Sequence, residues 1–228
     1  MAELFGDRMV ECLRAGDLIA RICPSMGGNV IQFGNSSAGV EALRIPPDAR
    51  TLRDNPNVYG MPLLFPPNRI CGGTYTFQGR TYAFPINEPE RNNFIHGTLS
   101  STNFSVMEEL ETPEYAAFSM EYAATPEEPY LAFPHAFTLT LRYVLHESEG
   151  LAQTVTVRND SEQDMPFGLG FHTAFNAPVE ADCRLTLTAG REWLLERPRI
   201  RPNGQYAEGT PLQQALNGSG LPIRGAQL

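Results

Sequence analysis

Residues 137–145 read F-T-L-T-L-R-Y-V-L. Every second residue of this stretch is large and apolar, whereas two threonines and an arginine lie among the residues between them. A period of two residues is typical of a β-strand that buries one face. The turn-like H-E-S-E-G at 146–150 follows, and then the alternating, β-branched L-A-Q-T-V-T-V at 151–157. The whole of 137–157 therefore predicts a hairpin of two antiparallel strands.

Strand signals dominate the rest of the chain as well. The segment T-Y-T-F-Q-G-R-T-Y-A-F at 74–84 predicts a second hairpin, with Gln78-Gly79 at its turn. Shorter strands are expected at 18–23, 29–33, 115–123 and 184–188. The 20 glycines and 19 prolines interrupt almost every window long enough for a helix, and only 210–216 predicts one, capped by Thr210. We expect an all-β fold, a large antiparallel β-sandwich with few or no helices.

Length and composition indicate one globular domain over residues 1–228. The hydrophobic share of 42% and the charged share of 19% are those of an ordinary folded protein, and no repeat or linker divides the chain. The chain stops at G-L-P-I-R-G-A-Q-L (220–228), directly after a loop rich in Gly, Asn and Pro. A sheet without its last strands would leave exposed edges. We therefore expect this sandwich domain to be incomplete at its C-terminus.

Charge and targeting signals narrow the class of partner. A net charge of −9 argues against nucleic acid and against an anionic membrane, because both attract clustered Lys and Arg. The N-terminus has no secretion signal, and no apolar run is long enough to span a membrane. The four cysteines form no C-x-x-C pair, which favours reduced thiols in the cytoplasm. Neutral small molecules remain open as partners.

Two histidines lie beside glycines in stretches rich in aromatic and turn residues. They are His96 in N-N-F-I-H-G-T and His172 in F-G-L-G-F-H-T-A-F. Imidazole can give and take a proton near neutral pH, and glycine permits a close approach of a ligand. These features predict that both rings face one polar pocket. The alternative for each is a structural histidine that bonds the core backbone, as we expect for His135, while His146 lies in a hairpin turn and should face solvent.

The segment Y-G-M-P-L-L-F-P-P-N-R-I-C-G-G at 59–73 contains the other candidates. Asn68 and Arg69 are its strongly polar residues, in a connection constrained by three prolines and three glycines. Their fixed hydrogen-bond donors suit sugar hydroxyls or a carboxylate. An arginine that holds the loop by bonding backbone carbonyls is the open alternative. No zinc spacing, nucleophile elbow or phosphate-binding loop occurs, so we expect no metal and no cofactor.

Taken together, these segments resemble the aldose 1-epimerase (galactose mutarotase) family. The resemblance rests on five stretches in the family's order, from about residue 18 to 190: P-S-M-G-G-N-V-I-Q-F (24–33), G-M-P-L-L-F-P-P-N-R-I-C-G-G-T-Y-T-F-Q-G-R-T-Y (60–82), N-N-F-I-H-G (92–97), F-P-H-A-F-T-L-T-L-R-Y-V-L (133–145) and V-R-N-D-S-E-Q-D-M-P-F-G-L-G-F-H-T-A-F (157–175). The combination of N-R-I, I-H-G and G-x-H is more specific than any one piece.

The resemblance implies a supersandwich and a cofactor-free interconversion of the α and β anomers of a hexose such as galactose or glucose. It implies that His172 is the general acid toward the ring oxygen, that His96 assists by hydrogen bonding, and that Arg69 beside Asn68 holds sugar hydroxyls. In the family a glutamate near the C-terminus is the base and an aspartate before it binds sugar, and both would follow Leu228. The family also more often has P-Y-F where T-A-F follows His172 here.

Beside catalysis with a later glutamate, the sequence leaves four alternatives open. The chain could contain its own base, with Glu88, Glu90 and Glu180 as the candidates. It could be a non-catalytic sugar-binding or regulatory domain of the same fold. It could also be a hexose-6-phosphate epimerase, although the basic residues Arg69, Arg80 and Arg91 form a sparse cluster for a phosphate. A purely structural β-protein is the remaining alternative.

Overall fold

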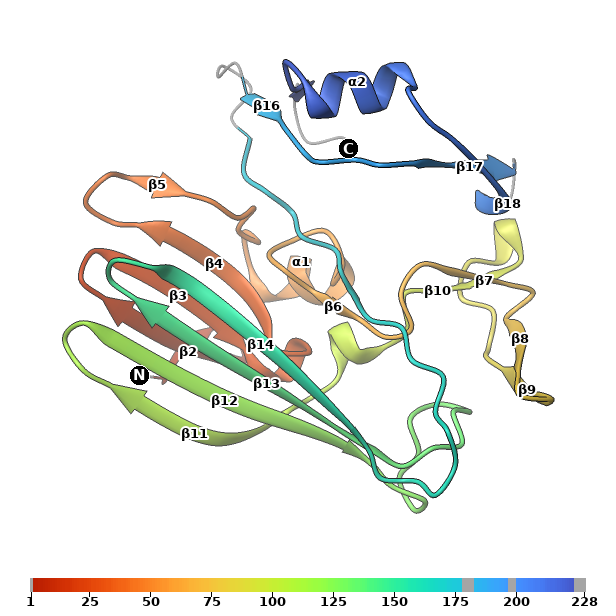
Figure 1. Cartoon of the computed structure of the whole chain (residues 1–228). Helices are drawn as coiled ribbons and strands as arrows, with labels where there is room; N and C mark the ends of the chain where they lie inside the picture. Colours follow the sequence, from red (N-terminus) through yellow and green to blue (C-terminus); the bar gives the residue numbers. More distant parts are fainter. Residues whose placement is uncertain (1, 178–182, 197–199, 224–228) are drawn as a thin grey trace.

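Two antiparallel sheets packed face to face form the body of the protein (Figure 1). The computed structural model describes residues 2–177, 183–196 and 200–223. The strands of the first sheet lie in sequence order: β1 (Ala2–Phe5), β2 (Arg8–Ala15), β3 (Leu18–Cys23), β4 (Asn29–Asn35) and β5 (Val40–Glu41). So do those of the second: β11 (Ser105–Glu111), β12 (Tyr115–Ala124), β13 (Phe137–His146) and β14 (Gly150–Asn159). The all-β sandwich expected from the sequence is confirmed.

The predicted hairpin at 137–157 is the pair β13–β14. The five alternating apolar side chains of β13 are fully buried: Phe137, Leu139, Leu141, Tyr143 and Leu145. The second predicted hairpin is also present, as β8 (Thr74–Phe77) and β9 (Arg80–Ala83). Its turn residues Gln78 and Gly79 have φ of 47° and 78°, the left-handed conformations that a two-residue hairpin turn requires.

The main core lies between the two sheets, where Leu13, Ile22 and Val30 meet Phe118 and Leu141. One polar contact crosses this core, because the buried Tyr143 hydroxyl donates to the carbonyl of Gly28. The same hydroxyl accepts a hydrogen bond of 3.0 Å from the side-chain amide of Gln153. A buried tyrosine is stable only when its hydroxyl has partners, and here these partners join the sheets.

Helices are few, as predicted. The helix predicted at 210–216 is α2 (Pro211–Asn217), with Thr210 as its cap. Helix α1 (Ala49–Asp54) was not predicted; its cap Asp48 accepts a 2.7 Å hydrogen bond from Thr51 N. This helix places Leu52 on the outer face of the first sheet, in a small second core with Ile31. Single 3-10 turns are η1 (Pro24–Met26), η2 (Pro89–Arg91) and η3 (Leu99–Ser101).

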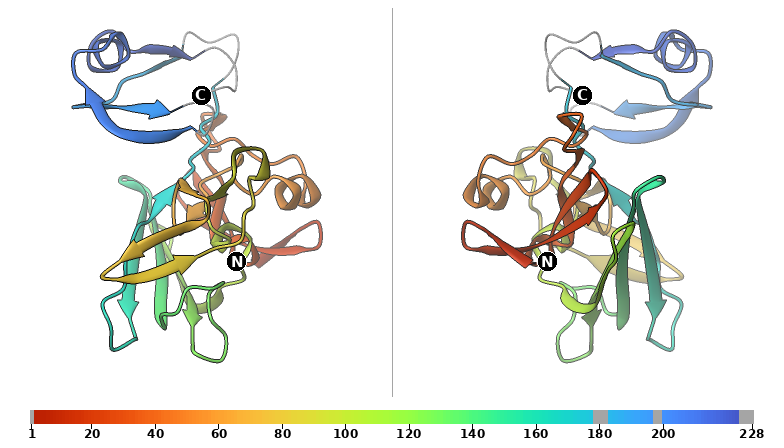
Figure 2. Two further views of the ribbon diagram at one scale, coloured as in Figure 1. Left: turned by 90° about the vertical axis from the view of Figure 1, so that its right-hand side faces the viewer. Right: turned by 90° about the vertical axis from the view of Figure 1, so that its left-hand side faces the viewer.

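The remaining strands form two-stranded pairs outside the sandwich. They are β6 (Leu63–Leu64) with β15 (Gly170–Phe171), β7 (Arg69–Cys71) with β10 (Asn93–Ile95), β16 (Cys183–Leu185) with β19 (Leu221–Ile223), and β17 (Glu192–Glu196) with β18 (Arg201–Ala207). Figure 2 shows the blue segment that contains β16 to β18 and α2 apart from the packed sheets and above them in both views. The strand predicted at 184–188 is thus shorter than expected, whereas the one at 18–23 matches β3.

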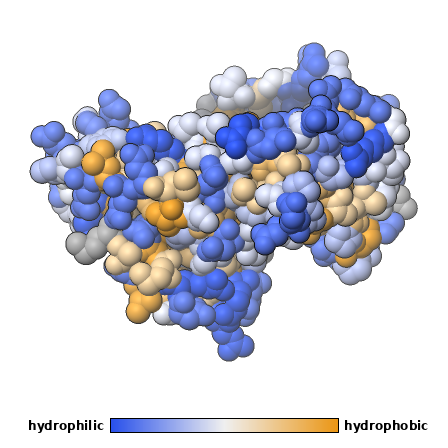
Figure 3. Space-filling model, turned by 90° about the horizontal axis from the view of Figure 1, so that it is seen from below, coloured by the Kyte–Doolittle hydropathy of each residue, from blue (hydrophilic) through white to orange (hydrophobic). Residues whose placement is uncertain are grey.

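The surface combines polar and apolar areas. In the view from below, orange hydrophobic patches lie between larger blue hydrophilic ones (Figure 3). The exposed apolar side chains include Val106, Met107 and Leu110 of the edge strand β11. Charged Glu108, Glu109 and Glu111 lie on the same strand, and charges on an edge strand oppose pairing with another chain. Within the described ranges, no helix has the length and apolarity needed to cross a membrane.

Candidate functional site

The segment 59–73 is the common support of both candidate histidines. Its first strand, β6, pairs with β15, which directly precedes His172. Its second strand, β7, pairs with β10, which directly precedes His96. Between the two strands, the peptide bond from Phe65 to Pro66 is cis, and the buried Phe65 ring packs 5.2 Å from the ring of Phe137. One core-anchored segment therefore holds two distant parts of the sequence side by side.

Backbone hydrogen bonds fix the position of His172. Its N–H donates to the carbonyl of Pro62 at 3.0 Å, and the N–H of Ala174 donates to the carbonyl of Gly60 at 2.8 Å. On the other side, Arg44 N donates to the carbonyl of Ala174 at 2.8 Å. The imidazole itself is exposed. The backbone of this segment is thus held from both sides while the ring stays accessible to a ligand.

His96 is held in an unusual backbone conformation. It has a φ of 64° and the following Gly97 a φ of 66°, both in the left-handed region. Its N–H donates to the carbonyl of Asn68 at 3.0 Å. A Cβ on Gly97 would lie 1.8 Å from the carbonyl oxygen of Phe65, so only glycine allows this close approach. The hydroxyl of Tyr130 donates to that same carbonyl and accepts from Thr98 N at 2.8 Å.

The structure brings the two imidazoles together. The ring centroids of His96 and His172 are 5.3 Å apart, with an angle of 72° between the planes. Nδ1 of His96 is buried and has no hydrogen-bond partner among the residues described. Burial lowers the pKa of His96 to about 4, helped by the nearby charges of His172 and Arg69 and opposed by Glu88. His96 is therefore a neutral hydrogen-bonding group at neutral pH.

Arg69 lies beside this pair, but its partner is one that the sequence analysis did not assign to it. Its Nε donates to Glu88 Oε2 and its Nη2 to Oε1, each at 2.8 Å. Arg91 Nη1 and Asn93 Nδ2 donate to the same carboxylate at 2.8 and 2.7 Å. The bonds from Arg69, Asn93 and Arg91 outweigh burial and lower the pKa of Glu88 to about 2. Among the described contacts, this ion pair takes the place of the alternative in which Arg69 holds the loop through backbone carbonyls.

Asn68 contacts His96 through its backbone carbonyl. It has a φ of 60°, its side chain is exposed, and its Oδ1 accepts a 2.9 Å hydrogen bond from Arg69 N. Its carbonyl holds His96, as described above. Of the four predicted residues, Asn68 directly precedes β7 and Arg69 begins it, while His96 and His172 directly follow β10 and β15. Their chemical roles remain predictions.

The other candidates differ in how they are placed. Glu90 is largely exposed and contacts Arg91 at 3.2 Å, and Glu180 lies outside the described residues.

His135 is structural, as predicted, because it is buried, with Nε2 2.8 Å from the hydroxyl of Tyr82. His146 is half-buried rather than solvent-facing, and its Nδ1 accepts a hydrogen bond from Ser148 N.

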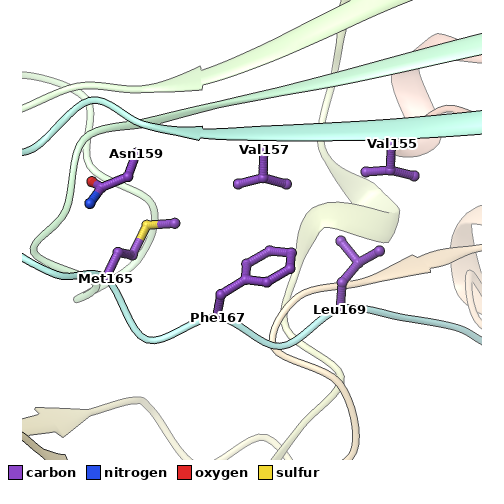
Figure 4. Close-up of a pocket in the computed structure, with 6 residues that line it drawn as sticks. All are labelled: Val155, Val157, Asn159, Met165, Phe167 and Leu169. Atoms are coloured by element: carbon purple, nitrogen blue, oxygen red, sulfur yellow. The ribbon is translucent and has the colours of Figure 1, made fainter.

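Two clefts share Phe167 in their linings. The first, of about 440 Å³, is lined by Arg69, Thr74 and aromatic side chains that include Tyr75 and Phe133. The second, of about 380 Å³, lies between Val155, Val157 and Asn159 of β14 and the facing Met165, Phe167 and Leu169 (Figure 4). The two histidines line neither cleft. Arg69 connects the first cleft to them, because it both lines that cleft and acts electrostatically on His96.

Five aromatic residues near the candidate site could stack on a sugar. Phe65 and Phe94 are buried and belong to the core, and Tyr75 is half-buried. Phe171 and Phe175, which flank His172, are exposed. Within residues 2–177, 183–196 and 200–223, no group of three or more His, Cys, Asp and Glu side chains is arranged to hold a metal ion.

A polar turn that was not predicted from the sequence precedes His96. Asn87 bonds both backbone groups of Ile95, accepting from its N–H at 2.6 Å and donating to its carbonyl at 2.9 Å. A signal was present in N-E-P-E-R-N-N (87–93), where asparagines that readily bond nearby backbone surround a Glu-x-x-Arg pair. The pairing of Glu88 with Arg69 joins residues 19 positions apart, and the spacing alone does not reveal it.

Comparisons with known proteins agree on one family. The family model described as aldose 1-epimerase matches residues 12–219. A galactose mutarotase-like protein from Clostridium acetobutylicum is 34% identical, with a TM-score of 0.91 over 97% of this chain and 68% of that one. Galactose 1-epimerase from Lactobacillus acidophilus shares the fold, with 16% identity and a TM-score of 0.73 over 96% of this chain and 68% of its own.

A curated relative gives a partial match. The uncharacterized protein YihR of Escherichia coli is 28% identical over 132 residues, which are 58% of this chain and 38% of YihR. The chain thus spans about two thirds of the length of those two solved structures, and it matches little more than a third of YihR.

Proposed function

Because the chain belongs to the aldose 1-epimerase family, we propose that it binds an aldohexose, such as galactose or glucose, and assists the interconversion of its α and β anomers. The main support is the 5.3 Å contact between the rings of His96 and His172, next to the guanidinium of Arg69. Imidazoles near a fixed cation are suited to proton transfer and hydrogen bonding at a sugar ring.

The reaction needs an acid and a base. A base takes the proton from the anomeric O1 hydroxyl while an acid gives a proton to the ring oxygen O5. The C1–O5 bond breaks and C1 and O1 form a carbonyl, so that the ring opens to a free aldehyde. Rotation about the C1–C2 bond and closure by the reverse steps give the other anomer. No electrons are gained or lost, and no cofactor is required.

We assign the acid role to His172 and a hydrogen-bonding role to His96. His172 is exposed, so a sugar can reach its ring. His96 has a pKa of about 4 and is neutral at pH 7, so it is suited to hydrogen bonding rather than to proton donation. The ring contact allows both imidazoles to meet one oxygen or two neighbouring oxygens of the same sugar.

Arg69 and Asn68 are the proposed hydroxyl-binding residues. Arg69 donates to Glu88 from Nε and Nη2. In the contacts described, its Nη1 hydrogens are not used by Glu88, so they can donate to a ligand. The exposed side-chain amide of Asn68 offers a second set of donors. The half-buried Tyr75 in the neighbouring cleft would contact the apolar face of the sugar.

Glu88 is not a suitable base. Its carboxylate accepts bonds from Arg69, Arg91 and Asn93, and its pKa is about 2, so it has little tendency to take a proton near pH 7. Among the described residues, no other carboxylate is placed beside the two histidines to take this role. We therefore expect the 228-residue chain to bind sugar and to accelerate anomer exchange only slowly.

Magnetisation-exchange NMR on equilibrated galactose and glucose tests this function, because it measures slow exchange between anomers directly. We expect the chain to raise the exchange rate above that of buffer. His172→Ala should remove most of this acceleration, since a general acid contributes about 10²–10⁴-fold. His146→Ala is the matched control and should keep it, because His146 lies at the end of β13 and bonds Ser148. Full acceleration by His172→Ala would contradict the acid role.

One alternative function has a specific observation in its favour. The engagement of Glu88 by two arginines supports a sugar-binding domain without catalysis. Such a domain would bind sugar in a titration yet leave the anomer exchange rate at that of buffer.

The hexose-6-phosphate alternative is weaker, because Arg69 and Arg91 share one carboxylate and Arg80 instead donates to Gln163 at 3.0 Å. Comparing the binding of glucose and glucose 6-phosphate separates these cases.

A further inference from the structure

One buried carboxylate joins three elements around the candidate site. Glu88 is only 6% exposed, yet it is ionised and contacts Arg69 of β7, Arg91 of η2 and Asn93 of β10. Burying a charge is costly unless it is paired and hydrogen-bonded. Every described contact of this carboxylate is with a cation or an amide donor.

The carboxylate is itself fixed by the backbone. Glu88 and Asn93 form a β-bridge, with Glu88 N donating to the Asn93 carbonyl at 3.0 Å and Asn93 N to the Glu88 carbonyl at 3.2 Å. The adjacent Asn87 bonds both backbone groups of Ile95, the residue before His96. The turn that presents Glu88 therefore also fixes the approach to His96.

The geometry at Arg69 restricts its guanidinium to one orientation. Two nearly parallel bonds from Nε and Nη2 to the two carboxylate oxygens form a bidentate pair, which defines the guanidinium plane. Arg91 shares this carboxylate and also contacts Glu90 at 3.2 Å, so two guanidinium groups face two carboxylates. The charge of Arg69 lowers the pKa of His96, and that of Glu88 raises it.

We propose that Glu88 is a positioning residue, which orients the guanidinium of Arg69 toward the hydroxyl groups of the bound sugar. This inference rests on the proposed function, because it assumes that a sugar is the ligand of Arg69. Glu88 touches no sugar itself and acts only through Arg69. A residue that merely stabilises the loop would affect sugar binding whether or not Arg69 were present.

A double-mutant cycle on sugar affinity separates positioning from loop stability. The dissociation constant for galactose and for glucose is measured by chemical-shift titration of the 228-residue chain. Glu88→Gln keeps the shape of the side chain but removes its charge, and we expect it to weaken binding about tenfold, close to the loss caused by Arg69→Ala. In the Arg69→Ala background, adding Glu88→Gln should change the dissociation constant by less than about twofold.

Asp160→Asn is the matched control. It also replaces an acid by its amide and removes an ion pair, here with Arg158 on the β13–β14 hairpin, and should leave the affinity unchanged. A readout independent of sugar is the side-chain Nε–H signal of Arg69, which should be protected from exchange in the wild type and lost in Glu88→Gln. Thermal unfolding of each variant verifies that it is folded.

The outcomes distinguish the two proposals. Unchanged sugar affinity in Glu88→Gln, or an equal loss with and without Arg69, would overturn the positioning role while the sugar-binding function stands. A wild-type chain that binds neither sugar would contradict the proposed function, and the positioning role with it, even if the Arg69 signal confirms the ion pair.

Discussion

His96 combines two costs that an ordinary surface histidine avoids. It is in the left-handed region, where a non-glycine residue is strained by roughly 1–3 kcal/mol, and its half-buried ring has Nδ1 shielded from water. Hydrogen bonds of its backbone to Asn68 and of the adjacent Ile95 to Asn87 maintain this position. The surroundings therefore determine both where the ring lies and that it is uncharged.

The first prediction concerns the titration of His96. In an NMR titration its ring should remain neutral down to about pH 5 and gain a proton near its pKa of about 4. His172→Gln should raise this pKa, because the charge of His172 is one of the groups that lower it. Since the folded pKa is below the unfolded 6.5, stability is lost as the pH falls from about 6.5 to 4. A midpoint near 6.5 in the folded chain would contradict this account.

At the scale of elements, the pairing of 59–73 with two other segments sets the geometry of the site. Most of these contacts are between backbone groups, as in β6 with β15 and β7 with β10. The parallel bridge between Phe65 and Gly97 lies between these two pairs and brings the backbones closest. The position of His96 relative to His172 therefore depends on the lack of a side chain at Gly97.

Substitution of Gly97 tests this dependence. Gly97→Ala would place a Cβ 1.8 Å from the carbonyl oxygen of Phe65, so the turn at His96 must move. We expect the free energy of unfolding to fall by about 3 kcal/mol or more, and sugar binding to be lost. Gly72→Ala is the matched control, because Gly72 has a similar φ of 64° but nothing lies within 4 Å of its Cβ position. It should cost only about 1 kcal/mol, the penalty of the backbone conformation.

Urea unfolding and sugar titration of the two variants check the prediction. Equal losses in Gly97→Ala and Gly72→Ala would mean that the close approach to Phe65 has no special role.

The elements that the sequence predicted well are those with a local signal. Alternation along 137–145 and the Gln78-Gly79 turn depend on neighbouring residues, and both hairpins were correct. Helix α1 was missed because its six residues are too few for a clear period, although Asp48 after two prolines is a capping signal. The bond between Arg69 and Glu88 joins elements that only the folded chain brings together, so residue spacing could not predict it.

At the scale of the molecule, the two sheets are joined mainly by apolar packing with Tyr143 as a polar link. Tyr143 lies in the middle of the core, and its hydroxyl meets Gly28, which is in the turn before β4 of the opposite sheet. Gln153 of the neighbouring strand donates to it. The contact fixes how one sheet is placed on the other.

Removing this hydroxyl should destabilise the sandwich. Tyr143→Phe leaves the Gly28 carbonyl and the Gln153 amide without their partner, at a cost of about 1–3 kcal/mol. Tyr115→Phe also removes a hydroxyl that accepts a hydrogen bond, from Arg142 at 3.0 Å, but Tyr115 is half-buried and Arg142 can bond water instead. We expect Tyr115→Phe to lower the free energy of unfolding by less than about 1 kcal/mol. Urea unfolding at pH 7 measures both, and a larger loss for Tyr115→Phe would refute the link.

The overall architecture was easier to predict from the sequence than the relation between its parts. Strand-rich patterning and the family resemblance both indicated an antiparallel sandwich, which is confirmed. The two-residue period of β13 does not identify the sheet it faces, and the contact of Tyr143 with Gly28 spans 115 positions. Such pairings depend on how the sheets stack, which no short stretch specifies.

The dominance of backbone contacts around 59–73 has a consequence for redesign. Since main-chain hydrogen bonds set where His172 and the neighbouring segments lie, the identity of that side chain is free to vary without dismantling its support. Replacing His172 by a residue with another proton-transfer group, such as a carboxylate or a thiol, should therefore leave the supporting backbone in place. A family built on this plan can diversify its chemistry faster than its architecture.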